Sequence, residues 1–359
     1  MLESPFYAQR KDYSWLFRRI RNKGVVISKH EYDSFILPGD RADFQKIPCG
    51  KCIGCRLAYS RQWADRIMLE STLYREEDCY FFTVTYDDAH LPPLQRCIDK
   101  RTGEIFYFFP LLKRDLQLFL KNLRTRYYRL YGVRLNLRYF ACGEFGDKTN
   151  RPHFHLCVMN LPLFDLRVSE MFCQKRDGRK IGVLYESDFI NSCWMDSKSK
   201  TCKGGIAIGR LTWASAAYVA RYIFKKQLGK SRGMPEFVFQ DAHTGSDLKF
   251  QDQFTCMSLK PGIGALYFDL HKLDIVFSDQ VPVHTKSGVQ MHKPPRYFDS
   301  KTKELYPDIF DDIKAERRFV AISARLMELE QISLTEDEYL LQQEEIKMRS
   351  LRKLVRSSC

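Results

Sequence analysis

Residues 151–158 read Arg-Pro-His-Phe-His-Leu-Cys-Val, and this stretch decides the fold. Side chains alternate between the two faces of a β-strand, so His153 and His155 point to one face while Phe154 and Leu156 point to the other. The alternation predicts a half-buried strand with two imidazoles on its polar face. The preceding turn-forming stretch, residues 143–152, makes this strand the returning arm of a β-hairpin.

Two imidazoles on one face can hold a divalent cation, which then needs further ligands. Glu144 stands upstream across the expected hairpin, where its carboxylate is within reach as a third ligand. The alternative interpretation is a pair of partly exposed histidines that bind no metal.

The rest of the chain reads as one mixed domain with additions. Period-two runs and turn residues predict strands, and apolar residues at helical spacing predict helices. We expect strands near residues 80–86, 104–109, 135–143, 153–159 and 206–208, and helices near residues 56–75, 112–131 and 213–228.

Two tyrosines stand four residues apart in the last of these helices. Tyr218 and Tyr222 share a helix face, with Cβ atoms roughly 5 to 6 Å apart. A tyrosine hydroxyl can attack a phosphodiester, but its free pKa of about 10 requires a nearby cation or metal. Arg221 and Lys225 follow the two tyrosines at three-residue spacing. The alternative is an amphipathic helix with packed tyrosines and solvated cations.

The net charge of +14 favours a polyanionic partner. Residues 301–359 hold 11 basic and 12 acidic side chains, so the surplus lies in residues 1–300. Aromatic residues stand among the cations, as in Arg126-Tyr-Tyr-Arg129, where rings can stack on unpaired bases or simply belong to the core.

The chain has 12 cysteines but no apolar signal-peptide core near its start, and no window approaches the roughly 18 apolar residues of a membrane span. We therefore expect a soluble intracellular chain whose cysteines are reduced thiols or metal ligands. Cys49, Cys52 and Cys55 could bind a structural zinc ion, with free thiols or an iron–sulfur cluster as alternatives. Candidates for a fourth ligand are Cys79, Cys97 and His90.

Several segments together resemble the HUH endonucleases, and more closely the replication initiators of gokushovirus-type microviruses. The likeness runs from about residue 47 to residue 268. It rests on Pro48-Cys-Gly-Lys-Cys-x-x-Cys55, Trp63-Ala-x-Arg66, Phe82-Thr-Val-Thr-Tyr-Asp-Asp-x-His-Leu-Pro92, Gly143-Glu-Phe-Gly146, Arg151-Pro-His-Phe-His155, Tyr218-Val-Ala-Arg-Tyr-Ile-Phe-Lys-Lys226 and Lys260-Pro-Gly-Ile-Gly264.

The resemblance implies an α+β fold: an HUH-endonuclease-like antiparallel sheet flanked by helices, with an N-terminal cysteine-containing segment and a C-terminal helical tail. It also implies that His153, His155 and Glu144 bind a catalytic Mg²⁺ or Mn²⁺ ion. Tyr218 and Tyr222 would be alternating nucleophiles. Lys225 matches the family lysine that helps to place the phosphate, whereas Arg221 departs from lysine at the equivalent position.

The implied function is a metal-dependent, site-specific DNA endonuclease that starts rolling-circle replication. It would nick the origin of a circular phage genome, form a 5′-phosphotyrosine link and rejoin the displaced strand. Expected partners are single-stranded and replicative-form circular DNA with host helicase and polymerase, and the expected location is the host bacterial cytoplasm. The alternatives are an HUH transposase and a non-catalytic single-stranded nucleic-acid-binding protein.

The tail shows two helix signals. Ile309, Ile313, Val320, Ala324 and Met327 mark one helix stripe, and Thr335-x-x-Glu338 is a capping box that opens a second helix towards Val355. The expected organisation is a basic N-terminal region with cysteine cluster and helix (1–75), a nuclease core (76–230, with a polar insertion at about 161–203), a basic loop-rich extension (231–300) and a helical tail (301–359).

Overall fold

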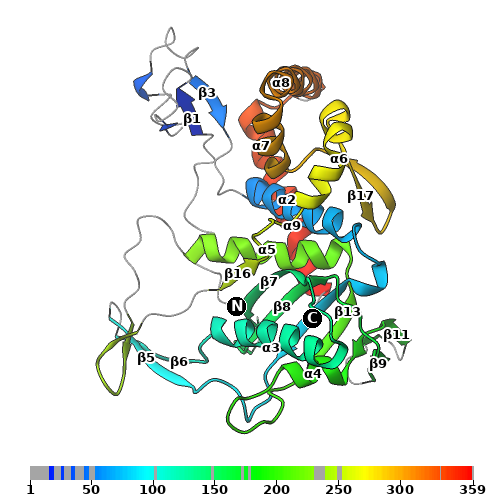
Figure 1. Ribbon diagram of the computed structural model, residues 1–359. Helices are drawn as coiled ribbons and strands as arrows, with labels where there is room; N and C mark the ends of the chain where they lie inside the picture. Colours follow the sequence, from blue (N-terminus) through cyan, green and yellow to red (C-terminus); the bar gives the residue numbers. More distant parts are fainter. Residues whose placement is uncertain are drawn as a thin grey trace. The chain divides into compact units, whose positions relative to one another are not determined.

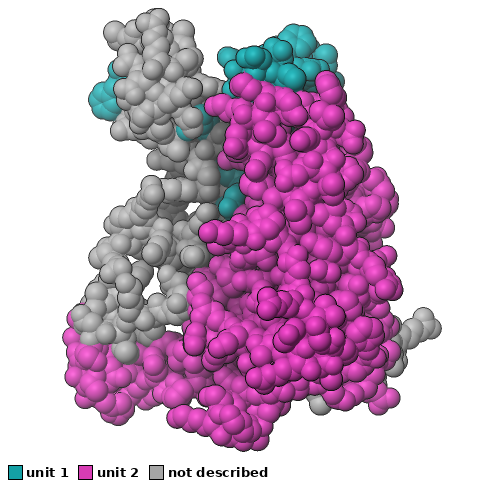
Figure 2. All heavy atoms as spheres, in the orientation of Figure 1, with its two compact units in different colours: residues 1–59, 308–359 teal, residues 60–307 magenta. Residues whose placement is uncertain are grey.

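The computed structural model forms two compact units, residues 1–59 with 308–359 and residues 60–307 (Figure 2). The fold is α+β, and its central sheet belongs to the second unit. The structure describes residues 16–19, 26–27, 34–36, 44–47, 53–100, 103–146, 149–170, 174–176, 179–229, 239–248, 253–331 and 333–357.

A seven-stranded antiparallel sheet organises the second unit, in the order β16-β7-β8-β4-β13-β12-β9. The hairpin expected around residues 143–152 is present, because β7 and β8 are its two arms. The bounds are β4 Tyr80–Thr85, β7 Arg138–Phe145, β8 Pro152–Met159, β9 Arg167–Val168, β12 Tyr185–Glu186, β13 Ile206–Arg210 and β16 Phe254–Met257.

Helices cover both faces of this sheet (Figure 1). On one face lie α3 (Lys113–Tyr131) and α4 (Asp188–Cys193), and on the other lies α5 (Trp213–Gly229). The face towards α3 carries the main core, in which Phe154 and Leu156 are fully buried. The apolar stripe predicted for α3 is buried as expected: Leu116, Phe119, Leu120 and Leu123.

A second hydrophobic cluster lies within the same unit, where α2 (Ile53–Ser71) packs with α6 (Ala265–Ser278), α7 (Arg296–Leu305) and β17 (Val281–Thr285). A four-stranded sheet in the order β15-β14-β5-β6 joins segments far apart in the chain. The remaining elements are β5 Gln95–Asp99, β6 Ile105–Phe108, β10 Gln174–Arg176, β11 Arg179–Gly182, β14 Phe239–Asp241, β15 Asp247–Leu248, β18 Gly288–His292 and the 3₁₀ turn η2 Glu76–Asp78.

The first unit contains the short strands β1 (Leu16–Arg19), β2 (Val26–Ile27) and β3 (Phe44–Ile47) and the helices α8 (Pro307–Glu330) and α9 (Glu336–Ser357). The predicted capping box at the start of α9 is confirmed. The Thr335 hydroxyl accepts from the backbone N–H of Glu338 at 3.4 Å, and Glu338 accepts from the backbone N–H of Thr335 at 2.9 Å. Among the described helices, none is both long and apolar enough to cross a membrane.

Two segments carry more regular structure than their sequences indicated. Residues 161–203, expected to be a polar insertion, add β9 and β12 to the central sheet and α4 to the core. Residues 231–300, expected to be loop-rich, contain α6, α7 and the edge strand β16. The short strands are too brief to show a clear alternation, and α6 has apolar residues on several sides.

A buried clasp explains two motifs that sequence alone left unassigned. The Arg138 guanidinium, at the start of β7, pairs with Glu70 of α2 and donates to the carbonyl of Pro261 at 2.8 Å. The other oxygen of Glu70 accepts from the backbone N–H of Gly264. Arg66 donates to the carbonyl of Ile263 at 2.7 Å. The Lys260–Gly264 segment is therefore bound by side chains of α2 and β7.

Arg66 itself is held between two aromatic rings. Its guanidinium lies 3.9 Å from the ring centroid of Trp63 and 4.2 Å from that of Tyr297. Such stacking leaves the edge of the guanidinium free to bind a carbonyl. The Trp63-Ala-x-Arg66 motif and the Lys260–Gly264 motif thus belong to one structural contact.

We expect Glu70→Gln to lower the free energy of unfolding by about 3–5 kcal/mol, because it leaves the Arg138 charge buried without its partner. Glu70 is fully buried and Arg138 is 3% exposed. Urea denaturation followed by circular dichroism measures the change. Glu77→Gln, which breaks the exposed Arg75–Glu77 pair, is the matched control and should leave stability unchanged. Equal stability of the two variants would contradict a structural role for the clasp.

Candidate metal centre and tyrosine helix

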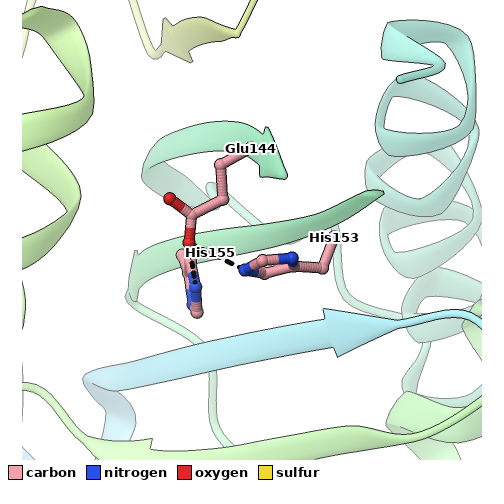
Figure 3. Close-up of side chains that lie close together, drawn as sticks. All are labelled: Glu144, His153 and His155. Atoms are coloured by element: carbon pink, nitrogen blue, oxygen red, sulfur yellow. Dashed lines mark hydrogen bonds and ion pairs between the residues drawn. The ribbon is translucent and has the colours of Figure 1, made fainter. Parts of the chain in front are cut away.

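The register of the β7–β8 hairpin brings three polar side chains together on the α5 face of the sheet. Glu144 pairs directly with His153, and Cys142 pairs with His155, so all four side chains share one face. One carboxylate oxygen of Glu144, Oε1, lies 2.7 Å from Nε2 of His153 and 2.8 Å from Nε2 of His155 (Figure 3). The two histidines expected to converge do so, and Glu144 joins them.

The second nitrogen of each imidazole is also held. Nδ1 of His155 lies 3.0 Å from the hydroxyl of Thr83 in β4, and Nδ1 of His153 lies 3.1 Å from the carbonyl of Arg151. Such outer hydrogen bonds set the tautomer and the orientation of a ligating histidine. Both Nε2 atoms are therefore aimed at the Glu144 carboxylate.

Burial and hydrogen bonding set the charges of the cluster. Burial opposes the carboxylate charge of Glu144, but hydrogen bonds from His153 and His155 outweigh it and hold the pKa of Glu144 below its usual value. Burial disfavours the imidazolium form and lowers the pKa of His155, although Glu144 opposes this shift. At neutral pH the cluster thus offers a neutral imidazole beside a carboxylate.

Tyr218 brings a hydroxyl group into the same cluster from α5. Its hydroxyl donates to Oε1 of Glu144 at 3.3 Å, and its ring stands perpendicular to that of His155 with centroids 5.1 Å apart. The guanidinium of Arg221 lies 5.3 Å from the centre of the Tyr218 ring. A phenol, a carboxylate, two imidazoles and a cation therefore meet on this face.

A hydrogen-bond network from α2 and β18 fixes the beginning of α5. The indole N–H of Trp213 donates to Oδ1 of Asp65 at 2.8 Å, and Nδ1 of His292 lies 3.0 Å from Oδ2 of the same carboxylate. The Ser60 hydroxyl donates to the carbonyl of Ala217, the residue before Tyr218. Asp65 is buried, so this network is a fixed support for the tyrosine helix.

Comparisons with known proteins agree with this arrangement. Residues 79–227 match the family model of the replication-associated protein ORF2. The Replication-associated protein ORF2 of Spiroplasma virus 4 is 31% identical over 277 residues, covering 77% of this chain and 74% of that protein. The chain belongs to this family of phage replication-associated proteins. The Replication-associated protein VP4 of Bdellovibrio phage phiMH2K is 34% identical over 200 residues, covering 54% of this chain and 53% of that protein.

A third member of the family, the Replication-associated protein ORF4 of Chlamydia phage 1, is 26% identical over 181 residues, which cover 50% of this chain and 38% of that protein. No solved structure matches the chain. The family match contains β4, β7, β8 and most of α5, which are the elements that carry the polar cluster.

The cluster fits a divalent cation. One ligand atom from each of Glu144, His153 and His155 lies within 4.8 Å of the others, and no second such group occurs among the described residues. The other oxygen of Glu144, Oε2, is buried and has no hydrogen-bond partner in the described part of the chain. Two imidazoles and a carboxylate suit a first-row divalent ion and leave coordination positions open for a substrate.

The remaining predicted site residues stay predictions. Tyr222 and Lys225 belong to α5, but their side chains lie outside the described residues. Cys49 and Cys52 also lie outside the described residues, and Cys55 stands in the first turn of α2.

The three candidates for a fourth cysteine-cluster ligand have other surroundings. Burial raises the pKa of the Cys79 thiol to about 11, and this thiol donates to the carbonyl of Ser71. Burial likewise raises the pKa of the Cys97 thiol in β5. Both shifts disfavour the thiolate that zinc requires. His90 is held between Asp87 at 2.7 Å and Thr201 at 2.8 Å.

Sequence reasoning missed Thr83 and Asp65 as supports of the site. Thr83 had a usable signal, because Thr83 and Thr85 alternate with the apolar Phe82 and Val84 and so mark the polar face of β4. Asp65 had none, because an acidic residue within a helix usually faces solvent.

We expect His155→Ala to weaken Mn²⁺ binding by at least about 100-fold, and Thr83→Val to weaken it by about 10- to 100-fold by releasing the His155 ring. Isothermal titration calorimetry of the full chain measures both affinities. His284→Ala, outside the cluster, is the matched control and should bind as the wild type does. Unchanged affinity in His155→Ala would remove this cluster as the metal centre.

Proposed function

We propose that the chain initiates rolling-circle replication by cutting one strand of a circular phage genome with a tyrosine. The observation that carries the proposal is the Tyr218 hydroxyl, which donates to Glu144 within the cluster of Glu144, His153 and His155. A nucleophile beside a candidate metal centre, in a family of phage replication-associated proteins, is what such a reaction needs. The three related phage proteins are all named replication-associated, which favours an initiator over a transposase.

The surroundings of Tyr218 suit an attacking phenol. A phenol with its usual pKa of about 10 is protonated at neutral pH, so its proton must be accepted as it attacks. Oε1 of Glu144 already accepts a hydrogen bond from this hydroxyl and is the nearest proton acceptor. The Arg221 cation beside the ring would stabilise the negative charge that develops on the phenol oxygen.

The covalent step balances without a further reactant. The phenol oxygen of the tyrosine bonds to phosphorus as the bond from phosphorus to the 3′ oxygen breaks. The departing 3′ oxygen takes up a proton and becomes a hydroxyl group, while the 5′ phosphate stays linked to tyrosine. Reversal, with a 3′ hydroxyl attacking the phosphotyrosine, rejoins the strand and frees the tyrosine.

Glu144, His153 and His155 would hold a Mg²⁺ or Mn²⁺ ion, which when bound withdraws charge from the scissile phosphate. The chain's own part is to orient both imidazoles through Thr83 and Arg151 and to place the Tyr218 hydroxyl at the cluster.

Tyr222 and Lys225 complete the proposal. Tyr222 stands one helical turn after Tyr218, so both hydroxyls can serve one phosphate position after a small shift. While one tyrosine holds the parental 5′ end, the other is free to cut the regenerated origin. Lys225 would help to place the phosphate.

The products define the partners. A free 3′ hydroxyl is a primer that only a polymerase can extend, and the strand ahead of it must be unwound. We therefore infer that the chain works on single-stranded and replicative-form circular DNA, together with host helicase and polymerase, inside the bacterial host.

We expect Tyr218→Phe and Tyr222→Phe each to leave one round of cutting intact, because the remaining tyrosine still reaches the phosphate. The double substitution should form no adduct. A labelled single-stranded origin oligonucleotide, incubated with Mn²⁺ and run on a denaturing gel, reveals the detergent-stable adduct. Each single variant should also fail to release unit-length circles in a replication assay.

Tyr107→Phe is the matched control, since Tyr107 is 60% exposed and lies outside the cluster. It should behave as the wild type in both assays. DNA retention without any adduct, for the wild type under either metal, would overturn the proposal in favour of a non-catalytic binding protein.

A further inference from the structure

A stripe of polar side chains follows one side of α3, which covers the sheet face opposite the metal centre (Figure 1). Their alternating four- and three-residue spacing places them on one side of the helix, over a length of about 22 Å. We call this stripe the α3 flank: Lys113, Gln117, Lys121, Arg124 and Tyr128.

The positive charge of the α3 flank is not neutralised by the protein. The acidic residue of α3, Asp115, is buried and is bound by Lys203 at 2.9 Å and by the Tyr86 hydroxyl at 2.7 Å. No described carboxylate forms an ion pair with Lys113, Lys121 or Arg124. The flank is therefore an uncompensated row of cations, which attracts a polyanion.

A hollow of about 340 Å³ opens between α3 and the edge strand β16, along the first half of the flank. Its walls combine apolar and aromatic groups with Lys113. The lining residues are Lys113, Leu116, Gln117, Leu120, Tyr139, Thr255, Cys256, Met257 and Leu259. Next to it, the Arg124 guanidinium lies 5.7 Å from the ring of Tyr139.

The second half of the flank offers an exposed aromatic ring. Tyr128 is 50% exposed, whereas its neighbour Tyr127 is buried against Tyr131 with ring centroids 4.6 Å apart. Of the two tyrosines in the Arg126–Arg129 motif, only Tyr128 can therefore stack on a base. Cations, an exposed ring and an apolar hollow in one row are the features by which proteins bind unpaired nucleic acid.

We infer that the α3 flank and its hollow form a second binding site for single-stranded DNA, separate from the tyrosine site. The cations contact phosphates, Tyr128 stacks on a base, and the hollow receives another base. The strand is unpaired, because the bases of a duplex are not free to enter a hollow or stack on a side chain. This site goes beyond the proposed cutting reaction, which takes place on the other face of the sheet.

The topology lets one strand of DNA reach both sites. β16 is the edge strand, and β7 lies between it and β8. At about 4.8 Å per strand, the edge is only about 10 Å from the strand that carries the histidines. A flexible single strand can turn around this edge, whereas a duplex, with a persistence length of about 50 nm, cannot.

The test compares variants of the full chain that differ in which side of α3 they change. Lys121→Glu alters the flank, and Arg126→Glu makes the same charge change on the other side of the same helix. Tyr128→Ala has Leu130→Ala as its control, since Leu130 is also exposed. Fluorescence anisotropy with a labelled strand of roughly 30 thymidines, which exceeds the site size of one single-strand-binding fold, gives the affinity over a series of salt concentrations.

We expect Lys121→Glu and Tyr128→Ala each to weaken binding at least about fivefold relative to their controls. Lys121→Glu should also reduce the slope of log affinity against log salt by about 0.7, the value for one lost phosphate contact on a single strand. Photo-crosslinking with halogenated uracil in the strand should label peptides of α3 or β16.

Flank variants that bind like their controls, or crosslinks confined to α5 and β8, would overturn the inference. Adduct formation on a short oligonucleotide is measured in parallel and should be unchanged in all four variants. A wild type that forms no adduct but shows the α3 dependence would instead contradict only the cutting reaction, so the two proposals fail separately.

Discussion

The antiparallel register between β7 and β8 is the constraint on which the site depends. It places Glu144 opposite His153 and leaves His155 opposite Cys142, so one carboxylate oxygen serves both imidazoles. A slip of one residue would turn Glu144 into the apolar core, because side chains alternate along a strand. The fully buried Phe154 fixes this register from the other face of the sheet.

Local periodicity explains how much of the fold could be predicted. The hairpin, α3, α5 and the capping box of α9 each carry their signal within a few residues, and the structure confirms them. The strand β16 could not be found in this way, because it pairs with β7 more than a hundred residues earlier in the chain. A sheet built from such distant segments is specified by packing between them, which no local pattern records.

The site divides along the same line. The convergence of His153, His155 and Glu144 followed from alternation and one turn, which are local features. The support of His155 by Thr83 depends on which strand lies beside β8, and the support of α5 by Asp65 depends on how two helices pack, with 148 residues between Asp65 and Trp213. Such contacts between distant residues become visible only in the folded chain.

Net charge alone is a poor guide to where the chain meets DNA, because many of its cations have structural partners. Arg138 is bound by Glu70 and backbone carbonyls, and Lys203 by Asp115. A cation already paired with a buried carboxylate releases few counterions when a phosphate approaches, so it contributes little to salt-dependent affinity. The useful criterion is the absence of a carboxylate partner, and by that criterion Lys121 and Arg124 on α3 are available to phosphate while Arg138 is not.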